Sequence, residues 1–216
     1  MEDVCRVTTG KVRLSYVHLF KPYAFQPGQE EKFSCTILVP KSDVETMARI
    51  NAALEAAKQR GASDKWGGIV PPMVATPVYD GDGTRPSDGM PFGQECKGHW
   101  VFTASAKIDY PPEVVDRQGN PIINQSEVYS GMYGRVNVVF YPYAFGGKKG
   151  IGCGLGPVQK LEDGETLGGN APSAAQVFGA PANQTSASVG YAGMQPAQVP
   201  WGQPAHGVDP ITGQPV

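Results

Sequence analysis

The chain is poor in the features that mark membrane, metal and redox proteins. No apolar run approaches the roughly 18 residues of a membrane span, and the N-terminal stretch MEDVCRVTTG lacks the apolar core of a signal peptide. The four cysteines are scattered without CxxC spacing, which argues against a zinc ribbon or a redox motif. We therefore expect no membrane association, and buried, reduced thiols in a cytosolic protein.

A net positive charge and the common catalytic motifs are also missing. The formal net charge is −2, so binding of nucleic acid would have to rely on a local group of cations. The sequence contains no GxSxG or HExxH motif and no acidic cluster of the kind a metal-dependent nuclease needs. Asp80-Gly-Asp82 begins like a calcium loop, but Arg85 and Pro91 occupy its sixth and twelfth positions, which indicates a polar surface loop. We expect a protein that is not an enzyme.

Charge is nearly absent from the last part of the chain. Between Gly168 and Val216 only Asp209 carries a formal charge, and the segment holds 7 Pro and 8 Gly with no helical or strand period. Such a segment cannot bury enough apolar surface to offset the entropy of ordering it. The sequence therefore predicts a folded domain over residues 1–167 and a disordered Gly/Pro/Ala/Gln-rich tail over residues 168–216.

The first 167 residues have the pattern of a mainly β domain. Lys32–Val39 and Gly98–Ile108 alternate apolar and polar positions, as strands with one buried face do. One helix is predicted over Ser42–Gln59, with Ser42 and Glu45 as a capping box and Gly61 as its stop. Five or six strands with one helix favour a small, OB-like (oligonucleotide-binding) barrel, and a β-sandwich is the alternative.

An aromatic hexapeptide occurs twice in this domain. Phe20–Phe25 reads FKPYAF and Phe140–Phe145 reads FYPYAF. Since proline cannot continue a central ladder, we expect each strand to end at its proline and the following rings to lie on a loop or an edge. Rings in that position can stack on the bases of a nucleic acid. The alternative is that they pack the ends of the barrel.

Both copies of the hexapeptide lie in segments without acidic residues. Val4–Gln29 and Val128–Leu161 each hold four basic residues and no acid, whereas Glu30–Glu127 holds 10 basic and 14 acidic residues. Cations among aromatic rings favour a groove that binds phosphates and stacks bases, although chance clustering would give the same pattern. The predicted DNA-binding residues are Lys21, Tyr23, Phe25, Lys107, Arg135, Tyr141, Tyr143, Phe145, Lys148 and Lys149.

The segment Gly146–Gly156, GGKKGIGCGLG, alternates glycine with apolar residues. As a strand it would have one apolar face and one face without side chains. The bare face would admit either a nucleotide or the single helix. Neither a P-loop nor a dinucleotide-binding fingerprint fits this spacing.

Several segments resemble the single-stranded DNA-binding proteins of tailed phages: Ser130–Tyr143, Lys149–Gly164, Lys32–Lys41 and Gly98–Phe102. The resemblance implies an OB fold and sequence-independent binding of single-stranded DNA during phage replication and recombination, in the cytoplasm of the bacterial host. It also implies a non-enzymatic role without a cofactor. Such proteins often end in an acidic tail that recruits replication proteins, whereas this tail has only Asp209. A tail contact with replication proteins and a homodimer both stay open. The alternative function is a phage structural or assembly protein.

Overall fold

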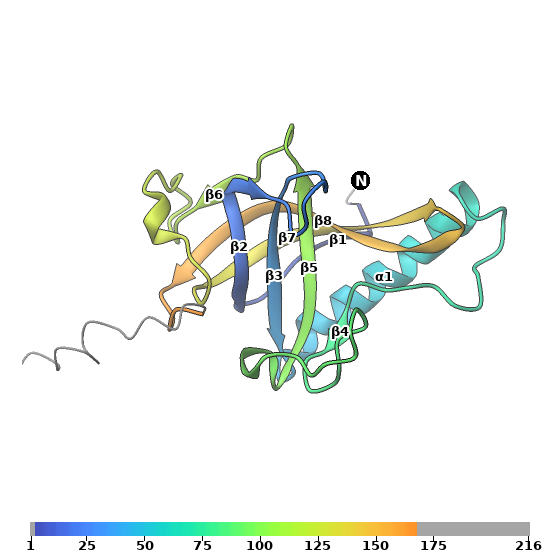
Figure 1. Ribbon diagram of the computed structural model, residues 1–216, viewed down its shortest axis with the longest axis horizontal. Coiled ribbons are helices and arrows are strands. Elements are labelled where there is room, and N and C mark those ends of the chain that lie inside the picture. Colours follow the sequence, from blue (N-terminus) through green and yellow to red (C-terminus); the bar gives the residue numbers. More distant parts are fainter. Residues whose placement is uncertain (1–2, 168–216) are drawn as a thin grey trace, which may run out of the picture. The chain divides into compact units, whose positions relative to one another are not determined.

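The computed structural model describes residues 3–167, so the predicted tail, 168–216, lies outside the described residues. The described part holds one α-helix, eight strands and two short 3-10 helices (Figure 1). Their bounds are β1 Arg6–Thr8, β2 Val12–Tyr23, β3 Lys32–Pro40, α1 Val44–Asp64, β4 Tyr79–Asp80, η1 Gln94–Cys96, β5 His99–Lys107, β6 Val114–Val115, η2 Gln125–Glu127, β7 Tyr133–Phe145 and β8 Lys148–Glu162. No helix of this part is long and apolar enough to cross a membrane.

Five of the strands form a closed ring in the order β2–β3–β5–β8–β7, because β7 pairs again with β2. The neighbours are antiparallel except β5 and β8, which run parallel and pair only at Ser105 and Gly154. The short strands β1, β4 and β6 pair alongside β7, β5 and β8 respectively. The prediction of a mainly β, OB-like fold with a single helix is confirmed.

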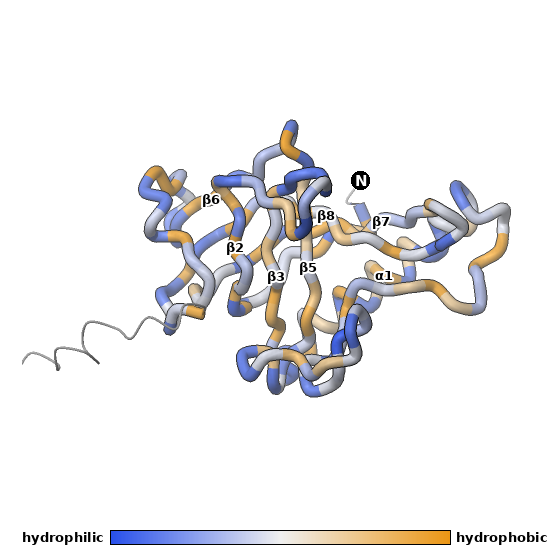
Figure 2. Tube along the Cα trace, viewed as in Figure 1, coloured by the Kyte–Doolittle hydropathy of each residue, from blue (hydrophilic) through white to orange (hydrophobic). Residues whose placement is uncertain are grey.

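The core lies inside this ring, and strand alternation predicts much of it. Phe33, Cys35, Ile37 and Val39 of β3 are all buried, as their spacing requires. Apolar positions recur along β3 and β5, while many of the turns at the strand ends are hydrophilic (Figure 2). One face of α1 closes the core, with Ile50 and Ala57 among its fully buried residues.

The predicted bounds of the helix are wrong at both ends. The N-cap is Asp43, whose carboxylate accepts a hydrogen bond from the Thr46 amide at 3.0 Å, and not Ser42. Serine and aspartate are comparable N-caps, so sequence alone does not choose between adjacent ones. The helix also continues through Gly61 to Asp64. A Cβ on Gly61 would lie 2.7 Å from the Trp66 ring, so this glycine serves packing and not termination.

The expectation that each strand ends at its proline is also wrong. Pro22 lies in an irregular part of β2, between the pairs His18–Ser34 and Tyr23–Lys32, where no ladder needs its amide. Pro142 pairs with Ile151, whose amide donates away from β7 to the Ala75 carbonyl at 2.8 Å. The missing N–H of Pro142 therefore faces the open side of β7 and costs no ladder bond.

The glycine-rich face of β8 lies against two tyrosine rings of β7 and not against the helix. A Cβ on Gly152 would lie 2.5 Å from the Tyr141 ring, and one on Gly150 would lie 2.6 Å from the Tyr143 hydroxyl. Tyr141 and Tyr143 pair with these glycines across the ladder. The strand lacks side chains on this face because the tyrosines of β7 lie over it.

Candidate nucleic-acid interface

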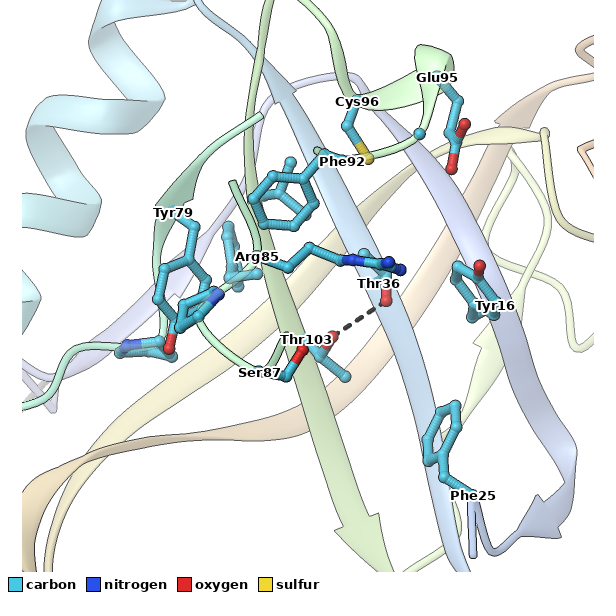
Figure 3. A pocket seen from close by; sticks show the side chains of 15 residues that line it. Tyr16, Phe25, Thr36, Tyr79, Arg85, Ser87, Phe92, Glu95, Cys96 and Thr103 are labelled. Carbon is cyan, nitrogen blue, oxygen red and sulfur yellow. Dashed lines mark hydrogen bonds between the residues drawn. The ribbon is translucent and has the colours of Figure 1, made fainter. Parts of the chain in front are cut away.

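Two connected hollows on the outer face of β2, β3 and β5 form what we term the outer groove. Their volumes are about 800 and 320 Å³, and both are lined by Phe25 and Thr103. Figure 3 shows the larger one, with aromatic side chains on both sides of the strands. The lining residues used below are Tyr16, Tyr23, Phe25, Ser34, Thr36, Tyr79, Arg85, Phe92, Cys96, Thr103 and Ser105.

Hydroxyl groups form the floor of the outer groove. The side chains of Thr36 and Thr103 lie opposite each other on β3 and β5 and share a hydrogen bond of 3.0 Å. The next pair toward the end of the groove is Ser34 and Ser105. Ser34 is only 3% exposed, and its Oγ has no hydrogen-bond partner within residues 3–167. A buried hydroxyl without a partner is unfavourable and marks a position where a ligand can supply one.

Aromatic rings from β2 and the chain that follows it form one wall. His18 and Tyr23 are stacked, with ring centroids 4.5 Å apart, and Phe25 stands edge-on to Tyr23 at 5.3 Å. Partial burial lowers the pKa of His18, which favours a neutral ring in this stack. Tyr23 and Phe25 stay about half exposed, so each has ring surface available for stacking.

Tyr16 reaches this wall through an irregularity in β2. Three residue steps from Ser15 to His18 face only two steps of β3, which is a β-bulge. Tyr16 has φ +47°, a backbone conformation that residues other than glycine rarely adopt, and its side chain is 57% exposed. The bulge turns the tyrosine ring toward the groove instead of leaving it in strand alternation.

The opposite wall is a loop fastened by a lysine. The ammonium group of Lys41 lies 2.6 Å from the carboxylates of both Asp80 and Asp82 and 5.2 Å from the centre of the Trp100 ring. These hydrogen bonds lower the pKa of both aspartates. The Asp80-Gly-Asp82 loop thus binds the protein's own cation, and it holds Tyr79 at the groove.

Arg85, Phe92 and Cys96 complete this wall. The Arg85 side chain extends from the loop toward Thr36, and Phe92 stands beside it (Figure 3). Burial raises the pKa of the Cys96 thiol to about 11, which keeps it protonated at neutral pH.

The predicted site residues fall into three places. Tyr23 and Phe25 line the outer groove, and Lys107 continues the row of Thr103 and Ser105 on the outer face of β5. Tyr141, Tyr143, Phe145, Lys148 and Lys149 lie on the hairpin of β7 and β8.

Lys21 and Arg135 lie apart from the other predicted residues. Lys21 lines a separate hollow beside Gln125 and Val128, and Arg135 donates to the Thr9 carbonyl at 3.2 Å near the start of β7. The ten residues therefore do not form one patch, and their role in DNA binding stays a prediction.

The outer groove and the hairpin nevertheless share one continuous face. Ser105 of the groove floor pairs directly with Gly154, so these two positions point to the same side of the ring. Gly154, Gly152 and Gly150 face outward because the residues between them are buried. The rings of Tyr141 and Tyr143 therefore continue the outer face beyond the floor of the groove.

The segments around the hexapeptides lack acidic residues in the sequence, but folding brings acidic side chains from other segments close to some of their cations. Folding brings Glu162 to Lys11 at 3.0 Å and Asp163 to Lys160 at 2.7 Å. Within the described part of the chain, none of the five predicted cations forms an ion pair. These cations are Lys21, Lys107, Arg135, Lys148 and Lys149.

Comparison with known proteins identifies relatives of this chain. The family model described as Enterobacter phage Enc34, ssDNA-binding protein, matches residues 5–188. The single-stranded DNA-binding protein of bacteriophage Enc34, solved in complex with ssDNA, is 28% identical with a TM-score of 0.63, over 76% of this chain and 90% of that chain.

Two further comparisons agree with this match. Protein p50 of Acyrthosiphon pisum secondary endosymbiont phage 1 is 28% identical over 80% of this chain and 92% of its own length. The ssDNA-binding protein gp2.5 of bacteriophage T7 is 16% identical, with a TM-score of 0.50 over 88% of this chain and 98% of that chain, and shows likeness of fold alone. Because the family model spans most of the sequence, the chain belongs to the family of the Enterobacter phage Enc34 ssDNA-binding protein.

Proposed function

We propose that this protein binds single-stranded DNA, without regard to sequence, along the outer groove and the adjoining face of the hairpin. The observation that carries the proposal is an open groove with aromatic rings on both walls and hydroxyls on its floor. Every base offers a ring face for stacking, so such a surface does not select a sequence. The solved relative from Enc34 is in complex with ssDNA, which supports the same partner here.

The proposed contacts divide into rings and cations. Bases stack on Tyr16, Tyr23 and Phe25 in the groove and on Tyr141 and Tyr143 beyond it. Phosphates are bound by cations without an ion pair in the described part of the chain, with Lys107 at the end of the groove floor and Lys148 and Lys149 on the hairpin. Lys21 and Arg135 are outlying candidates for a strand that continues past these surfaces.

The proposed role is stoichiometric protection of exposed strands during phage DNA replication and recombination. Binding through stacking and ion pairing leaves the strand chemically unchanged, so the protein acts as a binder and not as an enzyme. Such a role belongs in the cytoplasm of the bacterial host. Incubation with oligo-dT and Mg²⁺ should leave the strand intact, whereas its cleavage would overturn this part of the proposal.

Titration of the full chain with fluorescently labelled oligo-dT tests the function. We expect saturable binding at low salt and a log–log salt slope of about 0.7 for each neutralised phosphate, which is about 3.5 if all five predicted cations take part. A blunt duplex should compete weakly, because its bases are not open for stacking. Absence of binding to oligo-dT at low salt would contradict the proposal.

Ser34 gives a prediction in which stability and binding change in opposite directions. Ser34→Ala removes a buried hydroxyl without a partner, so the free energy of unfolding of the free protein should rise by about 1 kcal/mol. If the bound strand bonds to this hydroxyl, the same variant should weaken oligo-dT binding about 2- to 10-fold. Urea denaturation and anisotropy titration measure the two effects.

The control for this prediction is Ser105→Ala, across the ladder from Ser34. Ser105 is partly exposed, so water can satisfy its hydroxyl and its loss should leave stability unchanged. A Ser34→Ala variant that is less stable than the parent would show that the hydroxyl has a partner in the free protein.

A further inference from the structure

The hairpin of β7 and β8 forms an arm that extends beyond the ring. The two strands stay paired as far as Phe145 and Lys148, well past the pair of Ser105 and Gly154, where β8 contacts β5 (Figure 1). The arm is braced by the last turn of α1 and the residues that follow it. The indole nitrogen of Trp66 donates to the Tyr143 carbonyl at 3.1 Å, and Lys149 Nζ donates to the Trp66 carbonyl at 3.4 Å.

The tip of the arm has a defined conformation. Gly146 and Gly147 are the two residues between the strands, and both have positive φ, of 57° and 76°. Positive φ at both central positions is the requirement of a tight type I′ turn, which glycine meets without strain. The tip is therefore a tight two-residue turn at the end of a braced ribbon.

This tip presents an apolar ring beside two cations. Phe145 is 85% exposed, and it lines a hollow of about 200 Å³ together with Lys148 and Lys149. No acidic residue belongs to the hollow. A ring so exposed stabilises nothing in the described fold, whereas the nearby Phe140 of the same strand is fully buried. The combination fits a partner that offers both a flat apolar surface and phosphates.

The position of the tip indicates which part of a DNA molecule offers such a flat surface beside phosphates. The face that starts at the groove floor passes Gly154 and the rings of Tyr141 and Tyr143 before it reaches Phe145. A strand bound along this face leaves the protein at the tip. If the strand continues into a duplex, the last base pair of that duplex stands next to Phe145, and its open face is the flat surface that a ring stacks on.

We propose that the tip of the β7–β8 arm recognises the junction between single-stranded and double-stranded DNA. Phe145 stacks on the terminal base pair, and Lys148, its partner across the ladder on the same face, binds the phosphates beside it. This inference rests on the proposed binding of single strands along the outer face. It adds a preference for tailed duplexes, and for one tail polarity, because the path from the groove to the tip has a fixed direction.

The test compares the affinity of the full chain for three DNAs. They are an oligo-dT of about 15 nucleotides, within the site sizes known for OB folds, and a hairpin duplex that carries the same tail at either its 3′ or its 5′ end. One tailed duplex should bind about fivefold or more tightly than the tail alone, the low end of what one stacked ring contributes. Phe145→Ala should remove this preference, so that the variant binds the tailed duplex and oligo-dT with the same affinity within about twofold, and Phe145→Trp should keep the preference.

The other outcomes separate this inference from the proposed function. Equal affinity of the parent for tail and tailed duplexes, or a preference that survives in Phe145→Ala, would overturn the junction role alone. Equal preference for both tail polarities would contradict the fixed path from the groove to the tip and would also overturn it. Failure of the parent to bind any of the three DNAs would overturn the proposed function together with this inference.

Discussion

The Tyr16→Ala/Phe25→Ala double variant should bind oligo-dT with an affinity lower by about 2–6 kcal/mol, a loss of at least about 30-fold, because each stacked ring contributes about 1–3 kcal/mol. Both rings stand on the β2 side of the outer groove, and both are more than half exposed in the free protein. Their removal therefore takes away stacking surface without opening the core. Anisotropy titration at fixed low salt measures the loss.

The control for this double variant is Tyr110→Ala. Tyr110 is an exposed tyrosine, 73% accessible, that lines none of the hollows of the outer groove. Its loss should leave the affinity unchanged within about twofold. A double variant that binds like the parent would exclude the groove, and a large loss in Tyr141→Ala/Tyr143→Ala instead would move the interface to the hairpin.

The Phe140→Ala variant should lower the free energy of unfolding by about 3–5 kcal/mol, a large fraction of the stability of a typical domain. Phe140 is fully buried inside the ring, with its centroid 6.1 Å from that of Phe102. Removal of its ring leaves a cavity that the closed ring of strands cannot easily collapse into. Urea denaturation of the full chain, followed by tryptophan fluorescence, measures the change.

Phe145→Ala is the matched control on the same strand. Because Phe145 is 85% exposed, its truncation should change stability by no more than about 0.5 kcal/mol. Phe140 and Phe145 are the first and last residues of one copy of the repeated hexapeptide, so the two variants also test which of these rings packs in the core. A similar loss of stability in both variants would contradict the placement of Phe145 at an exposed tip.

Alternation along single strands was the reliable part of the sequence pattern. The period of two placed Phe33, Cys35 and Ile37 in the core correctly, because burial of one sheet face acts on each strand directly. Tyr23 and Phe25 were predicted from the hexapeptide alone, and both line the outer groove. Their exposure follows from the local chain, which leaves the regular ladder near Pro22.

The features that sequence missed depend on contacts between distant segments. Tyr16 reaches the groove through a bulge, and no residue type in β2 signals one. Strand alternation places Thr36 and Thr103 on the polar side of their strands. Only the pairing of β3 with β5 brings the two side chains together as the floor of the groove. Tyr79 and Phe92 belong to the long segment between α1 and β5, which is held by the pairing of β4 with β5 and by the ion pairs of Lys41.

The charge pattern and the glycine run were misleading for the same reason. Segments without acids acquired carboxylates from elsewhere, as Lys11 did from Glu162. The alternating glycines of β8 suggest a face that is open to a partner. The tyrosine rings that cover this face belong to β7, and only the pairing register of β7 with β8 identifies them.

The closure of the ring has a mechanical consequence. Four of its five contacts are antiparallel, whereas β5 and β8 are joined only where Ser105 meets Gly154. The contact of β2 with β7 is nearly as short, with two pairs, so the ring has two thin seams. Local opening is easiest at such places, because few bonds break there. The seam between β5 and β8 runs beside the hydroxyl floor of the groove, because Ser105 belongs to both. If the groove binds DNA as proposed, we expect flexing at this seam to adjust its width to bases of different size, while the longer ladders among β2, β3 and β5 stay intact.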